Sequence, residues 1–277
     1  MPGPCDGLCK GGVNVAGLHA ELYKDTKKLI EEKMSLLSDG LLKCGISSDL
    51  LENLEAKMET YIGEISLFNS AYNLTNTSDH DELVTRHILD SLAAYPVIKN
   101  LIEEMEKGSL EQDVGHHLAE NVPQSANSPR SEATPSLLLA DIGSGGGLPG
   151  IPLAAAFPQV KFNLVERMQK RCNFLENCTA ILGLKNVEVI CSEAEKIPEQ
   201  KYDLITFRAF RPLDKEMTKT LLKMVKNGGF LCAYKAKMDS ITEEMNGIKN
   251  LVPEYKVEKL TVPGLEDSER NLVIIKK

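Results

Sequence analysis

Short apolar runs that alternate with helical segments fill the second half of the chain, and they constrain the fold most strongly. Residues 137–142 (LLLADI) suit a strand that is buried on both faces of a sheet. Comparable runs follow at 160–166, 186–191, 202–207 and 230–235. Helices are expected between them at 167–182 and 213–225, and an antiparallel edge pair is expected at 255–262 and 271–277. This alternation predicts an α/β fold with a doubly wound, mostly parallel sheet.

The first half of the chain has the pattern of an N-terminal helical extension. Large apolar residues recur there at three- and four-residue steps: Leu29, Ile30, Met34 and Leu37, then Leu50, Leu51, Leu54, Met58, Ile62 and Ile65. A further helix is expected from Asp81 to Ala94, ending before Pro96. We divide the chain into four parts: a loose tail at 1–16, a helical region at 17–105, a flexible polar insertion at 106–136, and a Rossmann-like domain at 137–277.

The charge of the chain is unevenly distributed. The net charge is −8, which argues against a protein that coats nucleic acid nonspecifically. Residues 1–136 hold 11 basic and 22 acidic side chains, whereas residues 137–277 hold 21 basic and 18 acidic ones. Charges are screened beyond about 8 Å at physiological salt, so local patches matter more than the total. A structured RNA therefore stays open as a partner of the C-terminal half.

The cysteine pattern indicates a cytoplasmic protein with reduced thiols. Seven cysteines are scattered without a CxxC pair: Cys5, Cys9, Cys44, Cys172, Cys178, Cys191 and Cys232. No run of about 18 apolar residues is present, which argues against a membrane span. The N-terminus lacks the apolar core of a secretory signal. The adjacent His116 and His117 are interpreted as solvent-facing, and we expect no metal site.

A glycine-rich loop follows the first strand, at Asp141–Gly150 (DIGSGGGLPG). Glycines there let the backbone turn sharply and approach a ligand closely, and the carboxyl ends of parallel strands are where open α/β sheets bind nucleotides. The dinucleotide fingerprint GxGxxG lacks its third glycine, because Leu148 stands at that position. The alternative GxGxG is complete at Gly143, Gly145 and Gly147, and it looks like the first motif of S-adenosylmethionine-dependent methyltransferases.

Three further positions extend the candidate site. Glu166 ends the second strand, where a carboxylate can accept hydrogen bonds from both ribose hydroxyls; a helix N-terminal acid is the alternative. The turn at 192–195 (SEAE) could cover an adenine edge, or it is a solvated polar turn. Arg208 ends the fourth strand, where its guanidinium could hold a carboxylate or phosphate, or lie exposed at the rim.

Several sequence blocks together resemble the GidB/RsmG family of small-subunit (16S) ribosomal RNA (guanine-N7)-methyltransferases. The matching blocks are 72–75 (YNLT), 86–91 (RHILDS), 141–152 (DIGSGGGLPGIP), Lys170-Arg171, Phe174-Leu175, Ala194-Glu195, 208–210 (RAF), Lys235, 262–265 (VPGL) and 270–276 (RNLVIIK). RHILDS and GLPGIP are much more specific than a glycine-rich loop. The stretch between RHILDS and the first strand is longer than in the family pattern.

The resemblance implies a class I, Rossmann-like methyltransferase with S-adenosylmethionine as its cofactor. It implies that Gly143 and Leu148 contact the methyl donor, that Ala194 and Glu195 contact its adenosine part, and that Arg208 lies at the methionine or target end. The remaining donor contacts implied in this way are Gly145, Gly147 and Glu166, the last in place of a family aspartate.

The resemblance also implies an RNA substrate, with small-subunit ribosomal RNA or the small ribosomal subunit as the partner of a monomeric enzyme. We expect four side chains to contact RNA phosphates: Arg86, Lys170, Arg171 and Lys235. His87 would stack or hydrogen-bond near the target, or it packs on a helix surface. Guanine N7 carries a lone pair and no proton, so direct in-line attack needs no general base.

Four functions compete at this point. The first is methylation of small-subunit ribosomal RNA, and the second is methylation of another RNA or of a small molecule. The third is an NAD(P)-dependent oxidoreductase, which the GxGxxL pattern disfavours. The fourth is an RNA-binding protein without activity, against which the donor loop shows no disabling substitution.

Overall fold

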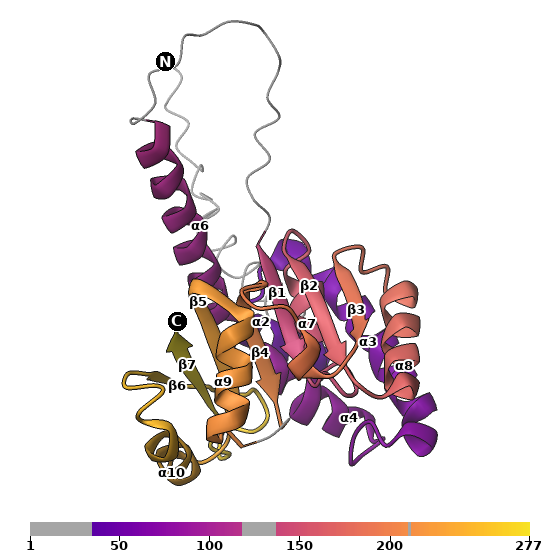
Figure 1. The fold of residues 1–277 in the computed structure, drawn as a ribbon. Helices are drawn as coiled ribbons and strands as arrows, with labels where there is room; N and C mark the ends of the chain where they lie inside the picture. The colour runs from indigo at the N-terminus through magenta and orange to yellow at the C-terminus, as the bar shows by residue number, and fades with distance from the viewer. Residues whose placement is uncertain (1–34, 118–136, 210–211) are drawn as a thin grey trace, which may run out of the picture. The chain divides into compact units, whose positions relative to one another are not determined.

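The computed structural model describes residues 35–117, 137–209 and 212–277 (Figure 1). Residues 36–277 belong to one compact unit. The predicted tail at 1–16, the start of the predicted helical region and the segment 118–136 lie outside the described residues. No helix among the described residues is long and apolar enough to cross a membrane.

A seven-stranded sheet forms the centre of this unit, in the order β3-β2-β1-β4-β5-β7-β6. The strands are β1 (Leu138–Ile142), β2 (Lys161–Glu166), β3 (Val187–Cys191), β4 (Tyr202–Arg208), β5 (Val225–Lys235), β6 (Lys256–Lys259) and β7 (Asn271–Lys276). The first five are parallel, whereas β7 is antiparallel to both β5 and β6. The predicted doubly wound sheet and its antiparallel edge pair are therefore confirmed.

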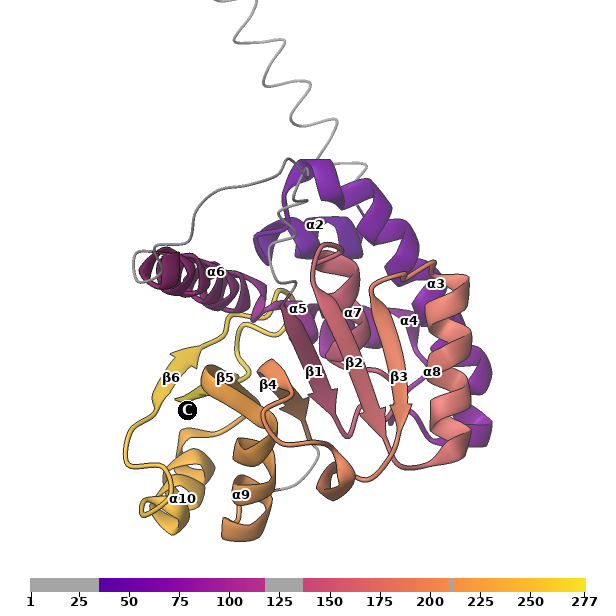
Figure 2. The same cartoon turned by 45° about the horizontal axis from the view of Figure 1, so that its top comes forward.

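The sheet is covered on both faces, and each face has its own core. Alternate residues of a strand point to opposite faces. Leu139 and Phe162 accordingly belong to the core shared with α7 (Gly150–Ala156) and α8 (Gln169–Ile181). Ala140 and Val165 belong to the core beneath α9 (Lys215–Met224) and α10 (Met238–Ile248). Figure 2 shows these two helical layers on either side of the strands.

The N-terminal helices extend the first of these layers. They are α2 (Leu36–Lys43), α3 (Ser48–Tyr72), α4 (His80–Leu83), the π-helix η1 (Val84–Leu89), α5 (Asp90–Leu92) and α6 (Tyr95–His117). The predicted apolar stripe of α3 is buried, at Leu54, Met58, Ile62 and Ile65. It joins the same core as Leu139 of the sheet, so the helical region and the Rossmann-like part share one apolar interior.

Three expectations about the helices differ from the structure. The helix expected over 81–94 occurs as three pieces with a π-helical turn at its centre, which contains Arg86 and His87. The segment 106–117, predicted as flexible, continues α6. Pro96 lies in the first turn of that helix, where its missing N–H costs nothing. The helix α10 was not predicted, although Ile241, Met245 and Ile248 form its buried stripe.

Candidate functional site

The glycine-rich loop turns directly after β1 and is held by backbone hydrogen bonds. Gly143, Gly145 and Gly147 all have positive φ, at 71°, 57° and 91°, a region that residues with a Cβ avoid. The N–H groups of Gly143 and Ser144 donate to the carbonyl of Val165, at 2.8 and 3.1 Å. A Cβ on Gly147 would lie only 2.5 Å from Ile151, so the loop also needs glycine for its packing.

Glu166 fixes this loop from the end of β2. Its side chain is buried, with 5% of the residue exposed. Oε2 accepts the N–H of Gly145 at 3.0 Å, and Oε1 accepts the N–H of Met168 at 2.9 Å. A carboxylate offers about four lone-pair sites, so each oxygen keeps one for a ligand hydroxyl.

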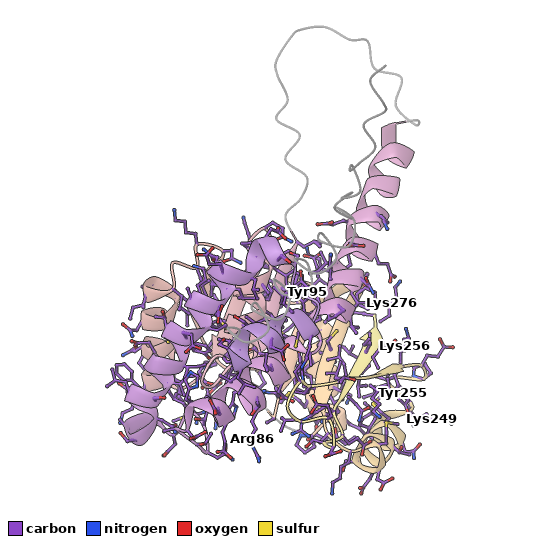
Figure 3. The ribbon with its side chains drawn as sticks, turned by 180° about the vertical axis from the view of Figure 1, so that it is seen from behind. Arg86, Tyr95, Lys249, Tyr255, Lys256 and Lys276 are labelled. Carbon is purple, nitrogen blue, oxygen red and sulfur yellow. The ribbon has the colours of Figure 1, made fainter. Side chains whose placement is uncertain are left out.

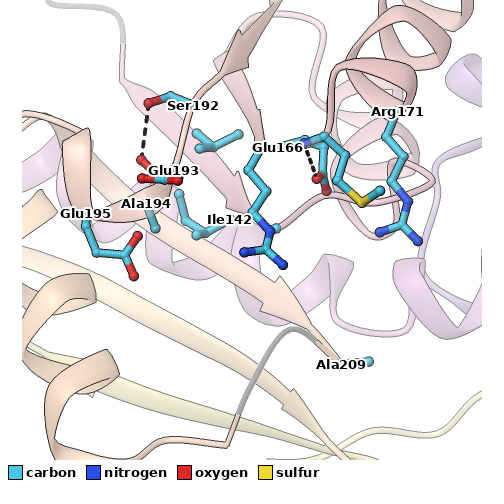
Figure 4. Close-up of a pocket in the computed structure, with 12 residues that line it drawn as sticks. Ile142, Glu166, Arg171, Ser192, Glu193, Ala194, Glu195 and Ala209 are labelled. Carbon is cyan, nitrogen blue, oxygen red and sulfur yellow. Dashed lines mark hydrogen bonds between the residues drawn. The ribbon is translucent and has the colours of Figure 1, made fainter.

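A pocket of about 460 Å³ opens beside Glu166, and we call it the β1–β3 pocket (Figure 4). It is lined by Ile142, Gly143, Val165, Glu166, Arg167, Met168, Arg171, Ser192, Glu193, Ala194, Glu195 and Ala209. Four predicted donor-binding residues therefore meet there: Gly143, Glu166, Ala194 and Glu195. The volume suits a nucleotide-sized ligand.

Four predicted donor contacts do not belong to the lining of the β1–β3 pocket: Gly145, Gly147, Leu148 and Arg208, the last of which lines a second pocket described below. Leu148 is 8% exposed and packs in the core, and Gly147 faces Ile151 and Leu175. Gly145 meets the pocket only indirectly, through its hydrogen bond to Glu166. Sequence reasoning missed Arg167 and Met168, which line the pocket. Their position directly after the strand-end acid is the signal that could have found them.

A second pocket of about 490 Å³ lies beyond the ends of β4 and β5, and we call it the β4–β5 pocket. Its lining comprises Asp90, Arg208, Ala209, Pro212, Tyr234, Lys235, Ala236, Glu244, Leu260, Arg270 and Asn271. Ala209, with a positive φ of 52°, lines both pockets. The two pockets therefore meet at the carboxyl end of β4.

Arg208 is held in the β4–β5 pocket by a bridged ion pair. Its Nη1 lies 2.6 Å from Oδ2 of Asp90, and Nε of Arg270 lies 2.9 Å from Oδ1 of the same carboxylate. The side chains of Arg208 and Asp90 are 15% and 9% exposed. Because both partners are mostly buried, the guanidinium has a fixed position and is not a rim side chain.

His87 lies against this ion pair and is neutral at physiological pH. Its Nδ1 is 3.4 Å from Nη2 of Arg208. Burial and the neighbouring Arg208 charge lower the pKa of His87 to about 4. Its Nε2 is buried and has no hydrogen-bond partner. A neutral imidazole beside a cation can offer a nitrogen to a ligand without adding charge.

The four predicted phosphate-binding cations do not form one patch. Arg86 is 53% exposed beside Glu82 and projects outward from the helical region (Figure 3), and Lys170 is also exposed. Arg171 lines the β1–β3 pocket and donates to the carbonyl of Asn73 at 3.4 Å. Lys235 lines the β4–β5 pocket and pairs with Glu244 at 2.6 Å. Two cations thus belong to pocket walls and two to the outer surface.

Among the described residues, no three His, Cys, Asp or Glu side chains are grouped so that they could hold a metal ion. The buried Asp141 is instead tied to the backbone, since its Oδ2 accepts the N–H of Gly150 at 3.0 Å. Burial raises the pKa of Asp141 to about 7. Through its hydrogen bond to Gly150, Asp141 holds the glycine-rich loop in place.

The sheet order, the glycine loop and the two adjoining pockets define a class I, Rossmann-like methyltransferase. The family model for rRNA small subunit methyltransferase G (GidB) matches residues 54–115 and 99–273. The chain belongs to this family, which decides between the two cofactor classes that the glycine spacing left open.

Curated relatives agree over nearly the whole chain. The chain is 41% identical to ribosomal RNA small subunit methyltransferase G of Treponema denticola over 263 residues, which cover 91% of this chain and 99% of the relative. The protein of the same name from Neisseria meningitidis serogroup B is 30% identical over 246 residues, covering 89% and 99%. The solved structure of a predicted O-methyltransferase from Agrobacterium tumefaciens aligns with a TM-score of 0.41 and 20% identity, covering 50% of this chain and 73% of that one.

Proposed function

We propose that the chain transfers a methyl group from S-adenosylmethionine to N7 of a guanosine in small-subunit (16S) ribosomal RNA. The names of the relatives support the substrate class. The main structural support for a transfer reaction is that the two pockets meet at Ala209, so a donor and an acceptor can face each other there. In this proposal the protein acts as a monomer in the cytoplasm and uses no metal ion.

The β1–β3 pocket fits the proposed donor. The free lone pairs of Glu166 can accept two ribose hydroxyls while its other pairs hold Gly145 and Met168. The carboxylates of Glu193 and Glu195 face the same space and suit a cationic ligand. When bound, S-adenosylmethionine supplies an electrophilic methyl group on a positively charged sulfur.

The remaining donor contacts are assigned by the same proposal. The backbone of Gly143 approaches the ligand without a side chain, and Ala194 packs against the adenosine part. Leu148 and Gly147 act by shaping the loop, since their contacts point into the protein, and Gly145 acts through its hydrogen bond to Glu166. Arg171 closes the pocket from α8.

The β4–β5 pocket would receive the target guanine. Guanine presents acceptors at N7 and O6 on one edge and donors at N1 and N2 on another. Arg208, held in place by Asp90, can donate to O6, which leaves the lone pair of N7 free to attack the methyl group. Glu244 is the carboxylate proposed for the donor edge, because its contacts with Lys235 and the Leu213 N–H both use Oε2, whereas each oxygen of Asp90 already faces an arginine. A base must leave its stack to enter such a pocket.

No general base is required for this transfer. Guanine N7 attacks with a lone pair and loses no proton, so the residues contribute by orientation and charge. The neutral His87 adds no positive charge beside a cationic donor. Outside the pockets, Arg86 and Lys170 are placed to contact RNA phosphates.

The direct test combines the protein, labelled S-adenosylmethionine and small ribosomal subunits from a strain that lacks this family's enzyme. Label recovered in 7-methylguanosine after digestion is the expected result. Label in another nucleoside would keep the donor and overturn the assigned acceptor atom. Failure to bind the donor would overturn the proposal as a whole.

A further inference from the structure

Two thiols meet directly behind the β1–β3 pocket. Cys172 lies in α8 and Cys191 ends β3, and their Sγ atoms are 2.6 Å apart. A disulfide requires about 2.05 Å between the sulfurs, so only a small movement separates these two free thiols from a bond. Cys44, Cys178 and Cys232 are the other free cysteines that the described residues include, and all three are buried.

The two thiols differ in their access to solvent. Cys191 is exposed, whereas Cys172 is buried. The Cys172 thiol also donates to the carbonyl of Glu166 at 3.2 Å. Burial, with the neighbouring Cys191, raises the pKa of the Cys172 thiol to about 12. An oxidant therefore reaches Cys191 first, and Cys172 stands within reach as the second thiol.

Both cysteines are next to residues of the pocket wall. Arg171 precedes Cys172, and Ser192 follows Cys191; both neighbours line the β1–β3 pocket. Cys191 is also the register partner of Glu166 in the β2–β3 ladder. A bond between the sulfurs would tie the start of α8 to the end of β3, behind the carboxylate proposed to hold the donor.

We propose that Cys172 and Cys191 are a modification site at which a hydroperoxide forms an intramolecular disulfide. The Cys191 thiolate attacks the peroxide, which gives a sulfenic acid and releases hydroxide, or water after protonation. The Cys172 thiol then displaces water from that sulfenic acid, and the S–S bond forms. Two thiols lose two hydrogens in total, and hydrogen peroxide is reduced to two molecules of water.

The disulfide has two consequences. It protects Cys191 from further, irreversible oxidation. It also cross-links two elements that are 19 residues apart in sequence, which restricts the unfolded chain. Because the sulfurs are already close, the pocket keeps its shape, and affinity for the methyl donor changes less than about threefold. The inference does not depend on which nucleotide is methylated.

Peptide mapping of the full chain tests the inference. The protein is treated with hydrogen peroxide, free thiols are alkylated under denaturing conditions, and it is digested with trypsin without reductant. We expect peptide 172–185 linked to peptide 186–196, with separation on adding dithiothreitol. Cys191→Ser changes the exposed partner and removes the link. Cys178→Ser is the matched control, because Cys178 shares the first peptide and must leave the link intact.

Thermal unfolding provides the second readout. Peroxide should raise the melting temperature of the wild-type protein by roughly 5 °C, reversibly, and leave Cys191→Ser unchanged. Recovery of Cys191 as a sulfinic acid with Cys172 alkylated would overturn the inference. A link from Cys191 to Cys5 or Cys9, or a link that persists in Cys172→Ser, would overturn it as well.

Discussion

The two adjoining pockets are built in different ways. The β1–β3 pocket draws eleven of its twelve lining residues from one stretch of chain, 142–195, and depends on backbone groups and one buried carboxylate. The β4–β5 pocket gathers side chains from α5, β4, β5, α10 and the approach to β7. Its central contact joins Asp90 and Arg270, which are 180 residues apart in sequence.

The difference separates two tasks. A common donor can be held by a local loop with fixed geometry, because the backbone N–H groups and glycines are set by short-range sequence. A particular acceptor needs charged side chains from distant elements, held by ion pairs. The N-terminal helices belong to the second task, since they supply Asp90 and His87.

The largest effect is expected from Arg208→Ala. Its loss removes the fixed guanidinium of the β4–β5 pocket, and we expect methyl transfer to fall at least 100-fold. Affinity for S-adenosylhomocysteine should stay within about threefold, because Glu166 and the loop are untouched. Single-turnover transfer and calorimetric binding measure the two quantities.

Lys226→Ala is the matched control for Arg208→Ala. Lys226 pairs with Asp203 at 2.9 Å, and neither residue lines the two pockets. This variant also removes a cation from an ion pair of the sheet. Equal loss of transfer in the two variants would show that Arg208 acts through stability alone.

A smaller effect is expected from Glu166→Ala, and it should weaken donor binding more than the transfer step. The variant loses the ligand acceptors and the hydrogen bonds to Gly145 and Met168. We expect the dissociation constant for the donor to rise about 10- to 100-fold, from hydrogen bonds to a charged group. Transfer at saturating donor should recover in large part. Unchanged donor affinity would remove Glu166 from the binding site.

The pH dependence of folding stability tests the lowered pKa of His87. The pKa of His87 is about 4 in the folded protein and about 6.5 in an unfolded chain. The unfolded chain therefore binds a proton first, and stability falls as the pH drops from about 6.5 to about 4. His87→Gln should show a shallower decline in urea unfolding over that range. The pKa of Asp141 is raised to about 7, so this group makes the folded state more stable as the pH drops. Its contribution is the same in both proteins and cancels when their stability curves are compared. Parallel curves for the two proteins would contradict this account.

The smallest effects are expected from Arg86→Ala and Lys170→Ala. Both side chains are exposed, so each substitution should weaken RNA binding only a few-fold. Each lost phosphate contact should lower the slope of log affinity against log salt by about one. Lys43→Ala, which removes an exposed lysine paired with Asp39, is the control. If no variant changes this slope, the RNA binds to another part of the protein surface.

The sequence predicted the sheet and much of the β1–β3 pocket, because both follow from local patterns. The strand runs and the glycine spacing located Gly143 and Glu166, whereas Ala194 and Glu195 were assigned by the family resemblance; all four line the pocket. Leu148 was assigned by family likeness, and its side chain instead packs inward. The segment 106–117 has few apolar residues, which hid the continuation of α6.

The β4–β5 pocket could be predicted only in part. Arg208 was singled out, but nothing local marks Asp90, Glu244 or Arg270 as its neighbours. Their meeting depends on the order of the strands and on the packing of α5 beside the sheet. Long-range ion pairs of this kind leave no periodic signal in a single sequence.

Restoring the modification in cells tests the account most directly. The wild-type chain and Arg208→Ala are expressed in a strain that lacks this family's enzyme, and small-subunit RNA is digested for nucleoside mass spectrometry. The account predicts 7-methylguanosine with the wild-type chain and none with Arg208→Ala at equal protein levels. No 7-methylguanosine with the wild-type chain, or equal amounts with both, would contradict it.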